Sequence, residues 1–380
     1  MRVVIAPDSF KESASAKTVA RALAAGVRRA APDAHIVEMP MADGGEGTVE
    51  TLVEARGGAF IEKEVTGPLG LPVTARYGLL DNGATAVIEM AAASGLALVP
   101  RDRRDPRFTT TRGTGELMAD ALERGVEHII LGLGGSATTD GGAGMAQALG
   151  YRLLDGNDGE LEPGGAALIH LARIDAKAKH GGIEHCKVLV ASDVRNPLCG
   201  EQGAARVYGP QKGATPEAVE VLDEALRHFA EIIARDLDKH VLDMAGAGAA
   251  GGLGAGLVAF AGGTLQPGVE LIADYCGLEA PICEADFVLT GEGGLGAQTL
   301  NGKTPYGVAR IARRHGVPVI AVAGSLEAGW EPLYDHGITA VFSILTGVMT
   351  LDEALAKAEP MLADAGEAIT RLWLAAKQST

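Results

Sequence analysis

The chain has 380 residues, of which 47% are hydrophobic and 22% charged; this allows a sizeable core and exceeds one typical domain. The formal net charge of −16 argues against nucleic acid and anionic membranes as partners, and 4% aromatic residues argue against a stacking platform for single strands. No segment has the ~18 consecutive apolar residues of a membrane span, and no signal peptide is recognisable at the N-terminus. We therefore expect a cytoplasmic protein.

The N-terminal segment alternates strands and helices, as expected for an α/β sheet. Apolar residues 2–6 predict a buried strand, the periodicity over 15–30 predicts an amphipathic helix, and 35–39 predict the next strand. Residues 60–80 instead predict strands joined by a turn. We place a domain boundary near residue 68 at this change of pattern.

Strand–helix alternation returns near residue 285 and continues to the end of the chain. The first and last segments are therefore expected to build one sheet. We predict a two-domain α/β protein, in which residues 1–68 and 285–380 form a Rossmann-like domain with a parallel sheet. Residues 69–284 would form an inserted second α/β domain. Within the insertion, the stretch 245–263 is rich in Gly and Ala but lacks the composition of a linker, so we expect a tightly packed helix.

The four cysteines include no C-x-x-C pair, so we expect neither a zinc site nor a disulfide framework. Reduced thiols, as in the cytoplasm, are the simplest interpretation.

The most informative stretch is HIILGLGGSATTDGGAGM, residues 128–145. Its order predicts a strand, a tight glycine-rich loop and a helix. Glycines allow close approach to an anion, and the N–H groups at a helix start point toward it. Ser136, Thr138 and Thr139 add hydroxyl donors, and Asp140 is a candidate metal ligand. We therefore predict a phosphate-binding loop.

Two other interpretations of this stretch stay open. A glycine-rich strand-to-helix turn can bind nothing. Alternatively, Gly132, Gly134 and Ala137 fit the spacing G-x-G-x-x-A, and Asp155 lies about 20 residues further on, as a dinucleotide-binding unit requires. That pattern predicts an oxidoreductase.

Polar loops rich in acids, hydroxyls and glycines follow five strand-like runs. In open α/β sheets, ligands bind at the carboxyl ends of strands, so these loops are expected to form one cleft. They are Asp8–Lys11, Asp43–Thr48, Gly132–Asp140, Asp193–Gly200 and Gly291–Gln298.

Several charged residues in and near these loops have a chemical and a purely structural interpretation. Lys11 is either a phosphate ligand or a surface lysine. Asp193 either accepts a proton from a substrate hydroxyl or forms a turn paired with Arg195. Arg112 either clamps a carboxylate or forms a surface salt bridge. Glu292 is a candidate metal ligand.

Seven blocks, in one order and over nearly the whole chain, resemble the bacterial glycerate kinase family (type I, glycerate 2-kinase). The resemblance implies a two-domain α/β fold with the active site in the cleft between the domains. It also implies phosphorylation of D-glycerate by ATP and Mg²⁺, with the 2-hydroxyl as the expected acceptor. The blocks are APDSFK from residue 6, ADGGEGT from 42, TRGTGE from 111, residues 132–145, SDVRNPL from 192, YGPQKG from 208 and NGK from 301.

With this resemblance, four groups of residues receive expected roles. Catalysis is expected of Asp193, Lys11 and Asp43; binding of ATP phosphates of Ser9, Gly134, Gly135, Ser136, Thr138, Thr139 and Lys303; binding of glycerate of Arg112, Arg195, Asn196 and Lys212; and binding of Mg²⁺ of Asp43, Asp140, Asp193 and Glu292. The expected partners are thus small molecules, and both a monomer and a homodimer fit.

One departure from the family pattern concerns Gly294 and Gly296, which stand where relatives carry an arginine and an aspartate. If those two charges pair with each other in relatives, losing both leaves no orphan charge. If either contacts a ligand, activity or specificity changes. A catalytically inactive protein that binds a hydroxy acid is therefore a further alternative.

Overall fold

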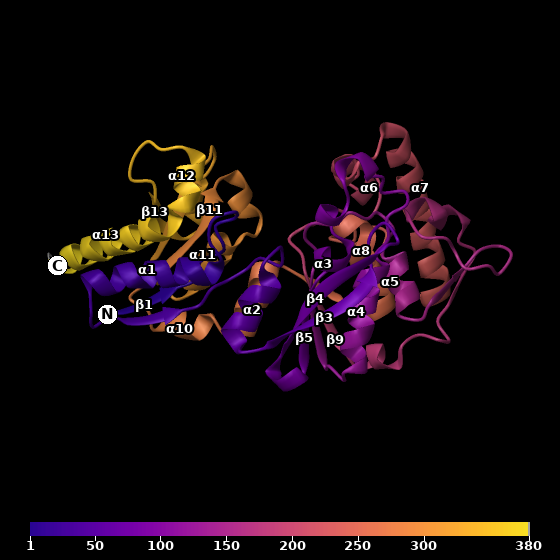
Figure 1. Ribbon diagram of the computed structural model, residues 1–380, viewed down its shortest axis with the longest axis horizontal. Coiled ribbons are helices and arrows are strands. Elements are labelled where there is room, and N and C mark those ends of the chain that lie inside the picture. Colours follow the sequence, from indigo (N-terminus) through magenta and orange to yellow (C-terminus); the bar gives the residue numbers. More distant parts are fainter. Residues whose placement is uncertain (379–380) are drawn as a thin grey trace. The chain divides into compact units, whose positions relative to one another are not determined.

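The computed structural model describes residues 1–378 and has the predicted α/β class. The chain divides into two compact units (Figure 1). The first unit contains Met1–Asp43 and the chain from Pro267 onward, and the second contains Gly44–Gln266. Within residues 1–378 no helix has the length and hydrophobicity needed to cross a bilayer.

The first unit is built on a five-stranded sheet in the order β13-β12-β11-β1-β2, with every neighbouring pair parallel. Its central strands are continuous apolar runs because both of their faces are covered. The strands are β1 (Arg2–Ile5), β2 (His35–Glu38), β11 (Phe287–Leu295), β12 (Val319–Leu326) and β13 (Ile338–Ser343).

Helices α1 and α13 pack together over one face of this sheet, the face of Val3, Ile5 and Phe287 (Figure 1). Ser15 caps α1 by accepting a hydrogen bond from the Thr18 N–H at 3.3 Å. A Cβ at Gly26 would lie 1.9 Å from a backbone oxygen of α13, so glycine permits this helix contact. The helices are α1 (Ala16–Ala30), α9 (Gly268–Cys276), α10 (Glu279–Cys283), α11 (Thr304–Arg314), α12 (Leu351–Ala356) and α13 (Ala358–Gln378).

The second unit has a six-stranded sheet in the order β10-β9-β6-β5-β4-β3. In this sheet β5, β6, β9 and β10 run parallel to one another, whereas β3 pairs with β4 and β4 pairs with β5 in antiparallel orientation. The strands are β3 (Ala59–Thr66), β4 (Pro72–Leu80), β5 (Thr85–Glu89), β6 (His128–Gly132), β9 (Lys187–Ala191) and β10 (Thr264–Gln266), with a separate antiparallel pair, β7 (Arg152–Leu154) and β8 (Arg173–Asp175).

The core of the second unit includes the ring contacts of Phe260 with Tyr151 and Phe229. The predicted small-residue helix is confirmed as α8, but Ala250, Gly251 and Gly252 have positive φ angles, so its first turn is left-handed. The helices are α2 (Thr48–Arg56), α3 (Ala91–Ser94), α4 (Arg112–Glu123), α5 (Ala143–Ala148), α6 (Ala204–Tyr208), α7 (Pro216–Leu237) and α8 (Ala249–Ala261).

The boundaries between the units differ from the predicted residues 68 and 284. Residues 44–68 belong to the second unit, because α2 packs on β4 and β5 and because β3 pairs with β4 along its whole length. Residues 267–284 belong to the first unit, because α9 and α10 pack on α11. The change of pattern near residue 60 thus lies inside a unit.

Candidate active site

The first unit places the carboxyl group of the half-buried Asp8 in the loop that follows β1. Its Oδ1 accepts a hydrogen bond from the Ser9 N–H at 2.6 Å, and its Oδ2 accepts one from the Thr304 hydroxyl at 2.5 Å. Burial raises the pKa of Asp8 to about 7, and the negative charges of Asp43 and Glu292 add to the rise. Asp8 therefore exchanges a proton near neutral pH.

Asp8 was absent from the residues selected from the sequence, although its loop was among the five. The available signal was an acid directly after a buried strand, the same signal that selected Asp193. Ser9, which was selected, also lies within 3.3 Å of Asp8 through its hydroxyl.

Glu292 lies in β11, the neighbour of β1, and is bonded by both oxygens. Oε1 accepts a hydrogen bond from the Thr299 hydroxyl at 2.8 Å, and Oε2 pairs with the Lys303 ammonium at 2.7 Å. Burial raises the pKa of Glu292, and the Lys303 contact opposes that rise. The expected metal ligand and the expected phosphate ligand thus bind each other in this structure.

Asp43 is half-buried, and its charge raises the pKa of both Asp8 and Glu292, so the three carboxylates form one electrostatic cluster. Lys11 is exposed, and its backbone nitrogen lies 3.6 Å from where a Cβ of Gly293 would be. The first unit therefore gathers Asp43, Lys11 and Glu292 at the carboxyl ends of neighbouring strands. Over residues 1–378, no group of three or more Asp, Glu, His and Cys side chains has an arrangement suited to a metal ion.

In the second unit, the glycine-rich loop begins where β6 ends. A Cβ at Gly132 would lie 2.2 Å from the Gly44 carbonyl oxygen, and one at Gly134 would lie 3.0 Å from the Gly45 Cα. Gly135 turns the chain with a φ of +74°. The glycines at 132 and 134 thus allow two backbone segments to pack, which differs from the predicted approach to an anion.

Asp140 occupies the position predicted for a bound phosphate. Its carboxylate is fully buried and accepts hydrogen bonds from the N–H groups of Gly142 at 3.1 Å and Gly144 at 3.2 Å, at the start of α5. It also accepts bonds from the N–H and hydroxyl of Thr111, both at 2.8 Å. Burial raises its pKa, and these bonds oppose the rise. Asp140 acts as a structural anion, which argues against its expected role as a Mg²⁺ ligand.

Lys212 lies buried against the same loop. Its ammonium donates to the Thr138 carbonyl at 2.5 Å and to the Ser136 hydroxyl at 3.4 Å. Burial lowers the pKa of Lys212 to about 7, and the charge of Asp140 opposes this. The Thr139 hydroxyl is buried without a hydrogen-bond partner. Lys212, expected to bind glycerate, thus supports the loop in this structure.

The loop after β9 starts beside the glycine-rich loop, because Gly132 is the strand partner of Ala191. Asp193 is half-buried and Arg195 exposed at this edge of the sheet. Asn196 stabilises the loop through two hydrogen bonds of 2.8 Å. Its side-chain amide nitrogen donates to the Gln202 carbonyl, and its side-chain oxygen accepts from the Tyr208 hydroxyl. Of the charged and amide residues of this loop, Arg195 is therefore the exposed one, whereas Asp193 and Asn196 are half-buried.

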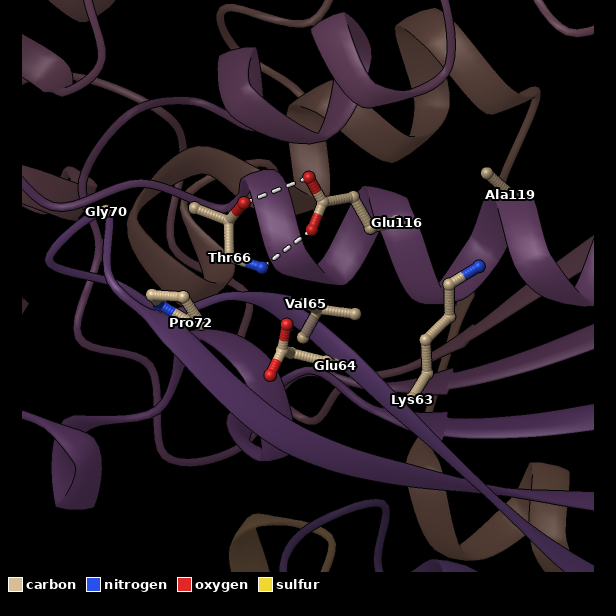
Figure 2. Close-up of a pocket in the computed structure, with 8 residues that line it drawn as sticks. All are labelled: Lys63, Glu64, Val65, Thr66, Gly70, Pro72, Glu116 and Ala119. Atoms are coloured by element: carbon tan, nitrogen blue, oxygen red, sulfur yellow. Dashed lines mark hydrogen bonds between the residues drawn. The ribbon is translucent and has the colours of Figure 1, made fainter.

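Arg112 is the first residue of α4 and forms a salt bridge, the structural alternative to binding a carboxylate of the substrate. Its Nε lies 3.1 Å from Glu116, which also accepts bonds from the N–H and hydroxyl of Thr66 at 2.7 and 3.0 Å (Figure 2). Glu116 lines a pocket of about 370 Å³ together with Lys63 and Glu64. None of the residues expected to bind ligands lines this pocket.

Gly294 and Gly296 share one neighbour. A Cβ at Gly294 would lie 3.1 Å from Oε1 of Glu327, and a Cβ at Gly296 would lie 3.1 Å from Oε2. An arginine at position 294 would therefore start beside a carboxylate that the chain already supplies.

Known proteins resemble this chain along nearly its whole length. A model of the glycerate kinase family matches residues 3–374. A glycerate kinase of Halalkalibacterium halodurans is 54% identical over 367 residues, 97% of each chain, and the glycerate 2-kinase of Escherichia coli K12 is 51% identical over 354 residues, 93% of each chain. A crystal structure of a candidate glycerate kinase 2 from Salmonella typhimurium LT2 superposes with a TM-score of 0.92 at 52% identity, covering 100% of this chain and 99% of that one.

The α/β architecture and these matches define the protein as a phosphotransferase. The chain belongs to the glycerate kinase family. The predicted family, fold class and type of enzyme are confirmed.

The oxidoreductase alternative is wrong, and the position of Asp155 gives the structural reason. In a dinucleotide-binding unit the acid follows a strand of the main sheet. Here it follows β7, which pairs only with β8 in the part of the chain that the structure describes. The Asp155 carboxylate accepts the N–H groups of Asn157 and Gly159 at 2.8 and 2.9 Å and closes a turn.

Proposed function

We propose that the protein transfers the terminal phosphoryl group of ATP to D-glycerate, giving ADP and 2-phosphoglycerate. The observation that carries the proposal is the family match, which spans both units. Membership of a kinase family implies ATP as the phosphoryl donor. The E. coli relative, a glycerate 2-kinase, supports the 2-hydroxyl as the acceptor.

Phosphoryl transfer requires little covalent chemistry from the protein; it requires an aligned acceptor and positive charge around the transferred group. We assign that charge to Lys11, which is exposed, and to Lys303. Lys303 would exchange its contact with Glu292 for a phosphate oxygen when ATP binds. Ser9, bonded to Asp8 beside these groups, would add a hydroxyl donor.

For Mg²⁺ the donor set of the first unit fits, because the ion prefers one or two carboxylates and keeps several waters. Asp43 and Asp8 are the ligands we propose, because Glu292 is already paired with the Lys303 ammonium, whereas the Ser9 N–H and the Thr304 hydroxyl, which donate to Asp8, are uncharged. A cation there would also relieve the repulsion that raises the pKa of Asp8. When bound, Mg²⁺ neutralises charge on the phosphates.

The acceptor would lie against the loop after β9. We assign to Asp193 the orientation of the glycerate hydroxyl and the acceptance of its proton, and to Arg195 the pairing with the glycerate carboxylate. Ser136 and Thr138 remain candidates for contact with phosphate through their loop, which Lys212 and Asp140 hold in place. The position of the active site in the cleft between the two domains stays a prediction.

A coupled assay of ADP release with D-glycerate, tartronate and glucarate tests the activity. We expect turnover with D-glycerate above that with the other two acids. Absence of ADP release, together with glycerate binding in calorimetry, would instead identify an inactive binding protein.

The position of phosphorylation is read by adding enolase to the product mixture. Enolase dehydrates 2-phosphoglycerate directly, so we expect phosphoenolpyruvate to appear at the rate of ADP release. Phosphoenolpyruvate that forms only after phosphoglycerate mutase is also added would show transfer to the 3-hydroxyl.

A further inference from the structure

Three side chains outside the proposed kinase site form a hydrogen-bonded series in the first unit. Cys283 is the last residue of α10 and is exposed. Its Sγ lies 3.4 Å from Nδ1 of His315, which directly follows α11. Nε2 of the same ring lies 2.8 Å from Oε1 of Glu279, at the start of α10. The series thus runs from a thiol through an imidazole to a carboxylate.

The carboxylate determines which nitrogen of His315 faces the thiol. Glu279 is an acceptor, so Nε2 carries the hydrogen and the neutral ring has its lone pair on Nδ1. The hydrogen bond from His315 lowers the pKa of Glu279, which keeps that acceptor ionised. Nδ1 is therefore oriented to take the proton of Cys283. A nucleophile, its base and an orienting carboxylate have this order in enzymes that activate thiols.

The other cysteines are less exposed than Cys283. Cys186 and Cys199 are buried, and burial raises their pKa values to about 11 and about 12, so both stay protonated thiols. Cys276 is half-buried. Cys283 combines exposure with a base.

A second and independent feature adjoins this series. Arg314, which lies 3.5 Å from Glu279, lines a pocket of about 510 Å³ together with Arg310 and Arg313. This volume suits a small ligand. In a chain of net charge −16, three arginines on one pocket favour an anion, although two acids line it as well: Glu270, which pairs with Arg310, and Asp274. Tyr306 adds an aromatic wall.

We propose that Cys283 is a modification site for small disulfides that carry carboxylate groups. The Cys283 proton moves to Nδ1 of His315, and the thiolate attacks one sulfur of the disulfide. A new S–S bond forms to Cys283, the S–S bond of the reagent breaks, and the departing sulfur leaves as a thiolate that takes up the proton. Cys283 is oxidised and the departing half of the reagent is reduced, so no other oxidant is needed.

The test is the rate at which the folded protein reacts with dithiobis(nitrobenzoate), a disulfide with two carboxylates. We expect one fast thiol, absent in Cys283→Ser and retained in Cys276→Ser. His315→Gln should slow that thiol about tenfold, because an unassisted cysteine is only a few per cent thiolate at pH 7. Kinase turnover and circular dichroism of Cys283→Ser should match those of the unaltered protein, which excludes misfolding as the cause.

The pocket is tested with uncharged dithiodipyridine as the matched reagent. Arg310→Gln leaves the Glu279 contacts in place and should slow the carboxylate reagent while leaving the uncharged one unchanged. Equal slowing of both reagents, or of neither, would overturn the role of the pocket. A fast thiol that persists in Cys283→Ser, or an unchanged rate in His315→Gln, would overturn the modification site itself.

Discussion

The polar clusters of the two units differ in how their charges are balanced. Around Asp8 in the first unit, carboxylates repel one another, and Lys303 neutralises only Glu292. In the second unit, the buried Lys212 ammonium is bonded to the glycine-rich loop, and the buried carboxylate of Asp140, the last residue of that loop, is bonded to Thr111 and to the start of α5. In the first arrangement carboxylates lie close enough to raise one another's pKa, which suits a cation; in the second the charged groups are hydrogen-bonded to the protein itself, which suits a scaffold.

The largest effect is expected at Asp193, in the loop that follows β9 of the second unit. Asp193→Asn should lower kcat by about 10²–10⁴-fold, because general base catalysis typically contributes that much. ATP binding, measured by calorimetry, should stay unchanged. Full turnover in this variant would remove Asp193 from the mechanism and restrict the chemistry to the first unit.

Replacement of the scaffold anion should primarily affect stability. Asp140→Ala leaves buried N–H groups of Gly142 and Gly144 without an acceptor, and each such group costs about 1–3 kcal/mol. We therefore expect the free energy of unfolding, measured by urea titration, to fall by the sum of the costs of these unsatisfied groups. If Asp140 instead holds a metal, stability without metal would change little and Mg²⁺ dependence would be lost.

The buried lysine predicts a pH dependence in the alkaline range. Lys212 has a pKa of about 7 in the folded chain and 10.5 as its ordinary value, so between these values the unfolded chain binds more protons. Stability should rise with pH across this window, relative to Lys212→Met, by about 1.4 kcal/mol per pH unit at most. Urea titrations of both proteins at several pH values measure the difference in stability. A difference that does not change with pH would contradict the lowered pKa of Lys212 in the folded chain.

The first unit should show the opposite slope. The pKa of Asp8 is raised from 3.8 to about 7, so between these values the folded chain binds more protons. Relative to Asp8→Asn, stability should therefore fall as pH rises through this window. Saturating Mg²⁺ should reduce the slope if Asp8 and Asp43 bind the ion, and an unchanged slope would assign the ion elsewhere.

The smallest effect is expected at the departure from the family pattern. The double variant Gly294→Arg with Gly296→Asp places its new side chains beside Glu327, an exposed residue with a flexible side chain. Gly296 is buried, so its replacement by aspartate beside the Glu327 carboxylate should lower stability, but we expect turnover to remain unchanged because the new arginine can pair with either acid. A changed kcat or KM for glycerate would show that position 294 or 296 contacts a ligand.

The sequence predicted those features that depend on local patterns. Apolar runs located β1, β6 and β11, and polar loops follow β1 and β6 as expected. The loop expected at Gly291–Gln298 is wrong in part, because β11 continues to Leu295 by pairing with β12. The strand–turn–helix order around Gly132 was also correct. These features follow from short-range periodicity and turn chemistry, which single residues report directly.

The sequence did not reveal the packing and hydrogen-bond partners of the loop residues. Glycines that pack against the backbone look identical to glycines that approach a phosphate, as Gly132 shows. Similarly, the sequence around Asp140 fits a metal ligand, whereas in the structure its carboxylate accepts hydrogen bonds from the N–H groups at the start of α5. The unit boundary was misplaced because the pairing of β3 with β4 is compatible with either unit until α2 is placed.

The parallel pairing of β1 with β11 has a consequence for synthesis of the chain. Val3 pairs with Phe287, so β1 and β2 remain without their central neighbour until the second unit has left the ribosome. At about 5–20 residues per second, the intervening chain takes on the order of tens of seconds to make. The inserted unit therefore has time to fold first, while the apolar strand β1 stays without its partner β11.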